Sequence, residues 1–533
     1  MKKIITVFIF IALYSCNLEE KVYSELLEET YEFGADEIYG IIGPCYSSLR
    51  GLFSNVNTRY YITQEITTDE SVRPANASGW DNAGIWRVLH QHNWTTELWQ
   101  LNDSWEYLYM GAIHSTRIIE LLQQEDRVPM PSGVNRESLI AEMKVARAFY
   151  HWLILDNFGD APIVKTISQT LPDNTPRENI FQFVIDEINS ALPYLSEEKG
   201  GKMYGRFNKW AAKSLLANIY LNAEVYTGHA YWDTVIDICN EIINSNLYEL
   251  DSDYRDFWAT HNEGSLENIF VVPFHETLAT GFQAHNISLH ASNRATYNLM
   301  SSPFGAGGFC AVPQFIDTYD PEDKRLGYTW IIGPQYASDG VTPVYCSYEK
   351  VGQPLVYTKE LPDGIYQGEN EGYRAGKWEV AKGARGQLNN DFPVFRYAGT
   401  LMMKAEALLR SGKSDQAAEI VTIVRQRAFD DPKKAKVTGS QLEEDSSYEW
   451  GYVENYEIVE PGNQDPVQYG RFYDELGWEF ALETTRRRDM IRFGTFTKKS
   501  WLSHKPNGEY RTIFPIIQRA IDANPNLKQN PNY

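Results

Sequence analysis

The residues best suited to ligand chemistry lie in an irregular stretch, residues 60–99, through which no helical period runs. Among its glycines and polar residues it carries Asp69, Glu70, Trp80, Trp86, Trp94 and Trp99. A flat indole face stacks on the C–H side of a sugar ring, and a carboxylate accepts a pair of hydroxyl hydrogens. We therefore predict Asp69, Trp80 and Trp86 as ligand contacts.

Two of these three residues have an alternative role in structure. Trp86 can staple the loop to the helices beneath it, and Asp69 can cap a helix or a turn. The sequence alone leaves both interpretations open.

A second irregular segment, about residues 247–391, contributes further candidates. Segments of this length without periodicity are usually functional inside a compact protein. In the loop GAGGFC, Phe309 and Cys310 can edge a pocket, and Arg374 in GYRAGKW can bind paired hydroxyls. Gly305, Gly307 and Gly308 resemble a phosphate-binding loop, but no strand is expected before them and no helix after them, so that interpretation fails.

Metal and cofactor sites are not expected. His90 and His92 are two apart without a third ligand in view, and we interpret them as surface histidines. The aspartates at 251, 253 and 256 hint at a calcium loop, but Asp256 stands where an EF-hand needs glycine and Asn262 where it needs glutamate. Four widely spaced cysteines, Cys45, Cys239, Cys310 and Cys346, match neither a small disulfide framework nor a zinc site.

Helical elements must position these segments, and the clearest runs from Phe392 to Ala428 as a helical hairpin. Tyr397, Leu401, Ala405 and Leu408 recur at helical spacing. Gly412 is expected as a left-handed cap and Ser414 as the N-cap of the second helix. Such a hairpin must stack on others, which is typical of tetratricopeptide-like repeats. Tyr397 either points its hydroxyl into a cleft beside the Gly-rich loop or belongs to the core.

Further helices are predicted at residues 36–52, 105–124, 137–158, 177–195, 206–226, 232–245 and 471–493. The last contains Arg486, Arg487 and Arg488 beside Asp489 and Glu483. An anionic-ligand patch is conceivable there, but these charges fall at pairing distances on a helix, so we interpret them as salt bridges that tie this helix to the scaffold. The sequence thus divides into a helical scaffold, 36–246 and 392–533, and an irregular ligand-binding insertion, about 247–391, within one domain.

The first residues predict the compartment. Lys2 and Lys3 precede an apolar run, 4–13, that is too short to span a bilayer and has the form of a signal peptide. It ends in Leu-Tyr-Ser-Cys, which resembles a bacterial lipobox, so residues 1–16 are predicted as a signal ending at a lipidated Cys16. An ordinary secretory signal with an incidental cysteine is the alternative. Residues 17–35, polar and acidic, are predicted as a tether.

The charge balance bounds the partners. The 533 residues include 71 Asp and Glu against 49 Lys and Arg, a net charge of −22. A nucleic-acid partner is excluded because phosphate binding needs a basic footprint. An acidic surface favours neutral or cationic ligands. The aromatic fraction of 14% either supplies a binding surface beyond the core or reflects helical repeats that pack with aromatic residues.

Five stretches together resemble the SusD/RagB family of outer-membrane nutrient-binding lipoproteins. They read AEMKVARAFYHWLILDNFGDAPIV, GRFNKWAAKSLLANIYLNAEVY, FPVFRYAGTLMMKAEALLRSG, WEFALETTRRRDMIRFG and NPNLKQNPNY, and they cover nearly the whole chain in order. One departure is Thr484, where the family commonly has glycine after the glutamate. The resemblance implies a mostly α fold, with about four tetratricopeptide-like hairpins and an irregular, loop-rich region folded over them.

The resemblance also implies function. Such proteins capture oligosaccharide at the cell surface, lie on a SusC-like TonB-dependent transporter of the outer membrane, and carry no catalysis and no cofactor. The family places ligand contacts in the 60–99 loop and in the irregular second half. Two other hypotheses remain: a surface glycoside hydrolase, which needs two carboxylates at a set separation, and the same fold with peptides as ligand.

Overall fold

The computed structural model describes residue 34 and residues 37–54, 59–168 and 170–533. The predicted signal segment 1–16 with Cys16, and all of the tether 17–35 except Gly34, lie outside the described residues. Within them, no helix is both long enough and apolar enough to cross a membrane.

Helices form most of the regular structure, in the tetratricopeptide-like arrangement that the sequence predicts. The long helices are α1 (Ile38–Ser54), α4 (Trp99–Leu122), α5 (Arg136–Phe158), α6 (Arg177–Ala191), α7 (Lys209–Leu221), α9 (Trp232–Asn244), α14 (Tyr397–Arg410), α15 (Ser414–Arg425) and α18 (Gly470–Phe480). Shorter ones are α2 (Arg59–Glu65), α3 (Ile85–His90), α8 (Ala223–Thr227), α10 (Ala284–Ser288), α11 (Arg294–Tyr297), α12 (Pro313–Ile316), α13 (Lys324–Thr329), α16 (Pro432–Ala435), α17 (Gly439–Leu442), α19 (Arg486–Arg492) and α20 (Gln518–Ala523).

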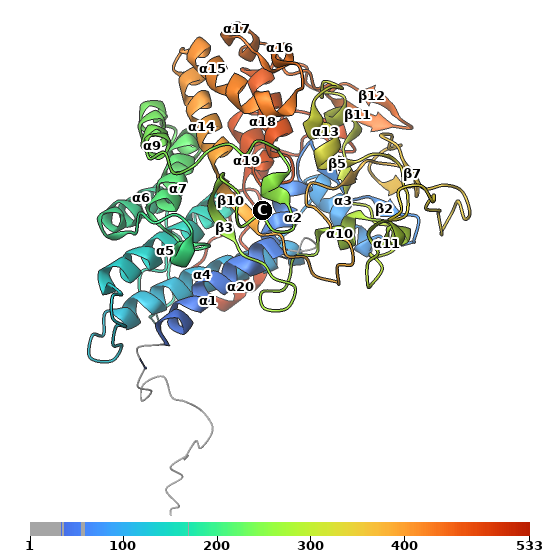
Figure 1. The fold of residues 1–533 in the computed structure, drawn as a ribbon. Helices are drawn as coiled ribbons and strands as arrows, with labels where there is room; N and C mark the ends of the chain where they lie inside the picture. The colour runs from blue at the N-terminus through green and yellow to red at the C-terminus, as the bar shows by residue number, and fades with distance from the viewer. Residues whose placement is uncertain (1–33, 35–36, 55–58, 169) are drawn as a thin grey trace, which may run out of the picture.

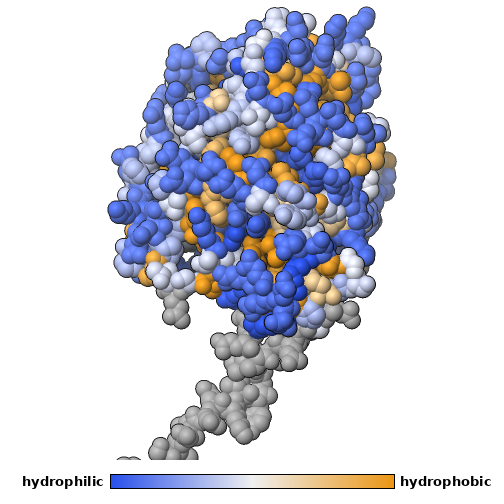
Figure 2. Space-filling view, turned by 90° about the vertical axis from the view of Figure 1, so that its left-hand side faces the viewer, coloured by the Kyte–Doolittle hydropathy of each residue, from blue (hydrophilic) through white to orange (hydrophobic). Residues whose placement is uncertain are grey.

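The long helices pack pairwise in a curved stack on the left and top of Figure 1, while short strands and loops fill its right side. α4 packs on α5 and α5 on α6, then α7 on α9, and α14 on both α9 and α15. Two helices begin at an asparagine N-cap. The side-chain oxygen of Asn135 accepts hydrogen bonds from two backbone N–H groups of α5, and that of Asn208 accepts one from α7. Figure 2 views the helical side, where hydrophilic residues cover most of the surface and apolar ones gather in strips across its centre.

The predicted hairpin is confirmed, with two corrections. Leu401, Leu408 and their neighbours are buried against α15, and Gly412 has a φ of +73°, as a left-handed cap requires. Ser414 does not cap α15; its hydroxyl instead donates to Glu443. The residues before α14, moreover, form a strand, because Phe392–Arg396 pairs with Asn268–Val272 of the irregular region.

The single helix predicted over 471–493 is wrong: α18 and α19 are separate. Between them Leu482 has a φ of +66° and Thr484 of +64°. These left-handed conformations are costly for branched side chains and favour glycine. This explains why the resembled family commonly has glycine at the position of Thr484.

The strands are short and join distant segments. They are β1 (Ser71–Val72), β2 (Ala75–Asn76), β3 (Asn268–Val272), β4 (Cys310–Ala311), β5 (Trp330–Ile331), β6 (Gly333–Pro334), β7 (Val356–Tyr357), β8 (Tyr366–Gln367), β9 (Arg374–Ala375), β10 (Phe392–Arg396), β11 (Gly451–Glu454), β12 (Glu457–Glu460) and β13 (Trp501–Leu502). One sheet has the order β1-β4-β9-β5, and β2 pairs with β8 in parallel. The irregular region is therefore joined by strand pairing to the loop that follows α2.

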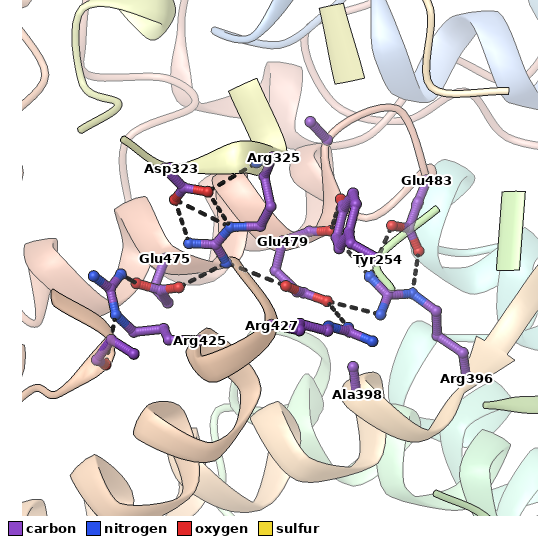
Figure 3. A network of polar contacts seen from close by, with 12 residues as sticks. Tyr254, Asp323, Arg325, Arg396, Ala398, Arg425, Arg427, Glu475, Glu479 and Glu483 are labelled. Atoms are coloured by element: carbon purple, nitrogen blue, oxygen red, sulfur yellow. Dashed lines mark hydrogen bonds and ion pairs between the residues drawn. The ribbon is translucent and has the colours of Figure 1, made fainter. Parts of the chain in front are cut away.

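A buried network of charges connects the irregular region to the helices (Figure 3). Arg325 of α13 pairs with Glu475 at 2.8 Å and with Glu479 at 3.1 Å, both on α18. Arg396 of β10 also reaches Glu479, at 2.8 Å, and Arg427 approaches the same carboxylate at 2.5 Å. All five side chains are at most 5% exposed.

The electrostatics of Glu479 follow from this arrangement. Burial disfavours its carboxylate, but the guanidinium groups of Arg427, Arg396 and Arg325 outweigh burial and lower the pKa of Glu479 to about 2. The carboxylate is therefore ionised at neutral pH, and its charge offsets those of the arginines.

Removing this carboxylate should strongly destabilise the protein. We expect Glu479→Ala to lower the free energy of unfolding by about 3–5 kcal/mol, because it leaves buried guanidinium groups uncompensated. Chemical denaturation measures the effect. The control is Glu460→Ala, which breaks the solvent-exposed pair with Lys505 and should leave stability unchanged within error. Equal stability of the two variants would contradict a central role for the network.

Candidate functional site

The turn 76–80 presents Trp80 at the surface. Asn76 organises this turn: its side-chain oxygen accepts from Ser78 N at 3.1 Å and from the Ser78 hydroxyl at 2.6 Å, while its Nδ2 donates to Gly307 O at 2.5 Å. The Gly79 N–H donates back to Asn76 O at 2.8 Å. The backbone under Trp80 is thereby fixed, and 39% of this side chain is exposed.

The Gly-rich loop lies directly beside this turn. A Cβ at Gly305, which has a φ of +61°, would lie 2.5 Å from the Ser78 hydroxyl oxygen. Only glycine accommodates both the close approach and the left-handed conformation. Phe304, the residue before Gly305, is exposed.

A third segment enters through the pairing of β2 with β8, which places Tyr366 opposite Ala75. The Tyr366 hydroxyl donates to Glu349, and Glu349 follows Tyr348 in a loop whose backbone N–H groups are held by Glu369. Trp80, Phe304, Tyr348 and Tyr366 are all between 37% and 55% exposed. We call these four residues with Ser78 and Glu349 the Trp80 surface.

The other predicted contacts occupy the interior. Asp69 is fully buried, and its carboxylate accepts from Arg486 Nε at 2.7 Å and from the Tyr473 hydroxyl at 2.7 Å. Arg374 is also buried and donates to the backbone oxygens of Glu371, Gly372 and Glu369. Neither side chain faces the surface: Asp69 joins its loop to α18 and α19, and Arg374 holds the loop between β8 and β9.

Phe309 and Cys310 are buried as well, at 1% and 0% exposure. Trp86 is 2% exposed and lies beneath Trp80, which matches its alternative role as a staple. Segments predicted to line the site lie side by side, since Val72, Cys310 and Arg374 are neighbours in one sheet. The sequence did not single out the exposed aromatic residues Phe304, Tyr348 and Tyr366. Their only sequence signal is an aromatic residue among glycine, serine and acidic neighbours.

Tyr397 lies elsewhere. It lines a groove of about 460 Å³ with Leu250, Lys404 and Ile420, between α9, α14 and α15. This groove belongs to the helical scaffold and is not beside the Gly-rich loop.

The structure corrects the interpretation of His90 and His92 and confirms that of the arginines of α19. His90 and His92 are not surface residues: both are buried with His504, and burial lowers the pKa of His90 to about 4. Within the described ranges, no group of three or more His, Cys, Asp or Glu side chains is placed to hold a metal ion. The arginines of α19 do tie the helix to the scaffold, as predicted, but through distant partners such as Asp69 and Tyr60.

Glu65 and Glu70, on either side of Asp69 in the chain, form a buried carboxyl pair that holds the α18–α19 break. Glu65 accepts from Thr484 N at 2.6 Å and Glu70 from Leu482 N at 3.0 Å. Burial, reinforced by Glu70, raises the pKa of Glu65 well above its usual value, and burial raises that of Glu70 to about 7. The pair therefore retains protons at pH values where exposed glutamates have lost them.

Comparison with known proteins gives consistent similarities. A family model described as the SusD family matches residues 312–533, and another described as "Starch-binding associating with outer membrane" matches residues 46–221. The starch-binding protein SusD of Bacteroides thetaiotaomicron is 24% identical over 432 residues, which cover 74% of this chain and 72% of that protein.

Solved structures share the fold. A SusD superfamily protein from Parabacteroides distasonis superposes with a TM-score of 0.70 at 18% identity, covering 94% of this chain and 100% of that one. Surface glycan-binding protein A from Bacteroides thetaiotaomicron, in complex with laminarihexaose, gives a TM-score of 0.68 at 19% identity, covering 93% and 99%.

The carboxyl pair predicts a pH dependence. Its contribution to stability is fully present below the unfolded-state pKa of about 4.3 and is lost as the pH rises through the folded-state values, near 7 for Glu70. Glu65→Gln keeps the acceptor for the Thr484 N–H and supplies an N–H toward Glu70. We therefore expect its free energy of unfolding to fall less than that of the wild type between pH 5 and pH 8. The difference is up to about 1.4 kcal/mol per pH unit for each proton no longer released.

Urea denaturation across this pH range measures the difference. Glu457→Gln, at an exposed position of β12, is the matched control and should follow the wild-type profile. Identical profiles for Glu65→Gln and the wild type would show that the pair does not retain a proton.

Proposed function

This chain belongs to the SusD family, and on that premise we propose that it is a surface glycan-binding protein that captures oligosaccharide or polysaccharide for uptake. The observation that carries the proposal is the partly exposed Trp80 indole. Its turn lies against the Gly-rich loop next to Phe304, and the strand before it, β2, pairs with β8, which carries Tyr366. An aromatic face of this kind stacks on sugar rings, and Ser78 and Glu349 supply hydroxyl-binding groups beside it. The relatives named as binding starch and laminarihexaose support this choice of ligand class.

The assembly and location follow from the same proposal. The captured glycan would pass to a SusC-like TonB-dependent transporter in the outer membrane, with the protein anchored at the cell surface through a lipid on Cys16. Support comes from the family description, which mentions association with the outer membrane, and from the lipobox-like sequence.

The hydrolase alternative has less support. A coupled carboxyl pair with raised pKa values exists, but Glu65 and Glu70 are at most 1% exposed and hold backbone N–H groups. A glycosidic bond cannot reach them. On the Trp80 surface, Glu349 already accepts the Tyr366 hydroxyl. We therefore propose binding without catalysis.

The charges around the Trp80 surface favour an uncharged glycan. Glu349, Asp363 and Glu371 lie along the β8 edge, and Glu371 accepts from the Gly368 N–H at 2.8 Å. Of the lysines near this edge, Lys359 is paired with Asp317 at 2.5 Å, and Lys350 follows Glu349 in the loop held by Glu369, where the acidic side chains outnumber it. A polymer of uronic or sulfated sugars would meet like charge here, whereas a neutral glucan would not.

Trp80 should be required for binding. We expect Trp80→Ala to weaken binding of laminarin or soluble starch by about tenfold or more, as for a central aromatic contact, measured by affinity electrophoresis and calorimetry. Trp99→Ala is the matched control, because Trp99 is equally exposed, at 38%, but on α4. Unchanged retardation by Trp80→Ala would place the site elsewhere, and release of reducing ends would favour the hydrolase.

Salt should separate ligand classes. For the wild-type protein we expect retardation by a neutral glucan to be the same at low and at physiological ionic strength, because no charge is paired on binding. Pectin and alginate should not retard it even at low salt. Strong binding of either polyanion, weakened by salt, would contradict the proposed neutral ligand.

A further inference from the structure

Arg73 lies behind the exposed tryptophan and touches two indole rings at once. Its guanidinium carbon is 4.3 Å from the centre of the Trp80 ring and 4.8 Å from the centre of the Trp86 ring. The two rings are 6.3 Å apart and tilted by 43°. Arg73 is only 3% exposed, so its contact is with the inner side of Trp80.

The elements that carry Arg73 and Trp86 are themselves fixed. Arg73 directly follows β1, which pairs with β4 in a buried sheet, and Pro74 restricts the backbone after it. Trp86 is part of α3 and is 2% exposed. Arg73 and Trp86 thus form a rigid support, whereas Trp80 lies on a turn.

The turn fixes the backbone of Trp80 but leaves its two side-chain torsions to be set by contacts. Among the described residues, the Trp80 ring packs on Arg73 and Trp86. A planar guanidinium over an indole face is favourable and orientation-specific. Burial lowers the pKa of Arg73 to about 9, which leaves it charged at neutral pH.

We propose that Arg73 is a positioning residue for glycan binding: stacked against Trp80 and supported by Trp86, it holds the outer face of the Trp80 indole toward solvent. The inference rests on the proposed function for its consequence in affinity, but not for its geometry. Preorganisation of this kind lowers the ordering cost that a ligand would otherwise meet.

The first test needs no ligand. The 14 tryptophans are labelled with 5-fluorotryptophan, and the Trp80 resonance is assigned in the fluorine NMR spectrum with Trp80→Phe. Arg73→Met, which keeps an unbranched side chain but removes the guanidinium, should shift and alter the linewidth of the Trp80 signal. Arg73→Lys retains the charge without the planar group and should give an intermediate effect.

The matched control is Arg471→Met. Arg471 also lies over an indole, 4.4 Å from the Trp478 ring centre, so this variant should change the Trp478 signal and leave Trp80 unaffected. If Arg73→Met does not fold, the milder Arg73→Lys provides the same comparison. A Trp80 signal unaltered by either Arg73 variant would overturn the proposal.

The second test measures affinity for laminarin and soluble starch. Arg73→Met should weaken binding about threefold to thirtyfold, the range between an exposed and a desolvated cation–π contact, and should add nothing further in a Trp80→Ala background. An equal loss in both backgrounds would overturn the positioning role, since Arg73 would then act independently of Trp80. If Trp80→Ala itself leaves binding intact, the proposed ligand site is wrong. A changed fluorine signal in the Arg73 variants would then still show that Arg73 positions the Trp80 ring.

Discussion

The fold depends on a buried charge network centred on one turn of α18. Glu475 and Glu479 lie four residues apart on this helix and pair with arginines of α13, β10, the last residue of α15 and the segment after α15. Such a network is weak evidence for net stability, because desolvation opposes the Coulomb attraction. Its geometry is nevertheless demanding, since each guanidinium must meet its carboxylate, and this fixes how the irregular region lies against the helices.

Because this charge network anchors it to α18, the irregular region can be rigid without long helices or strands. Strands of two residues could not hold a loop by themselves, but β1, β4 and β9 sit in one sheet whose buried side chains include Cys310 and Arg374. The Arg374 guanidinium donates to backbone oxygens of the loop that follows Tyr366, between β8 and β9. Buried side chains near the Trp80 surface thus hydrogen-bond the loop backbone, as neighbouring strands do in larger sheets.

The same construction explains why most of the predicted contacts are supporting residues. A ligand surface built from loops needs its charged groups inside, where they satisfy backbone atoms, and its aromatic faces outside. Asp69 and Trp80 illustrate the two cases: one is paired with Arg486 in the interior, and the other rests on Arg73 at the surface. Both lie within one irregular stretch of the sequence, and residue type alone does not tell them apart.

The sequence by itself determined the helical scaffold and indicated the loops from which the proposed site is built. Helical periodicity, Gly412 and the family-like motifs are local signals, and each depends on residues close together in the chain. Only the tertiary structure decided which side chains face outward. Exposure depends on contacts between residues hundreds of positions apart, such as Asp69 with Arg486 or Ser78 with Gly305, and on left-handed backbone at Thr484 that breaks a helix the local pattern would continue.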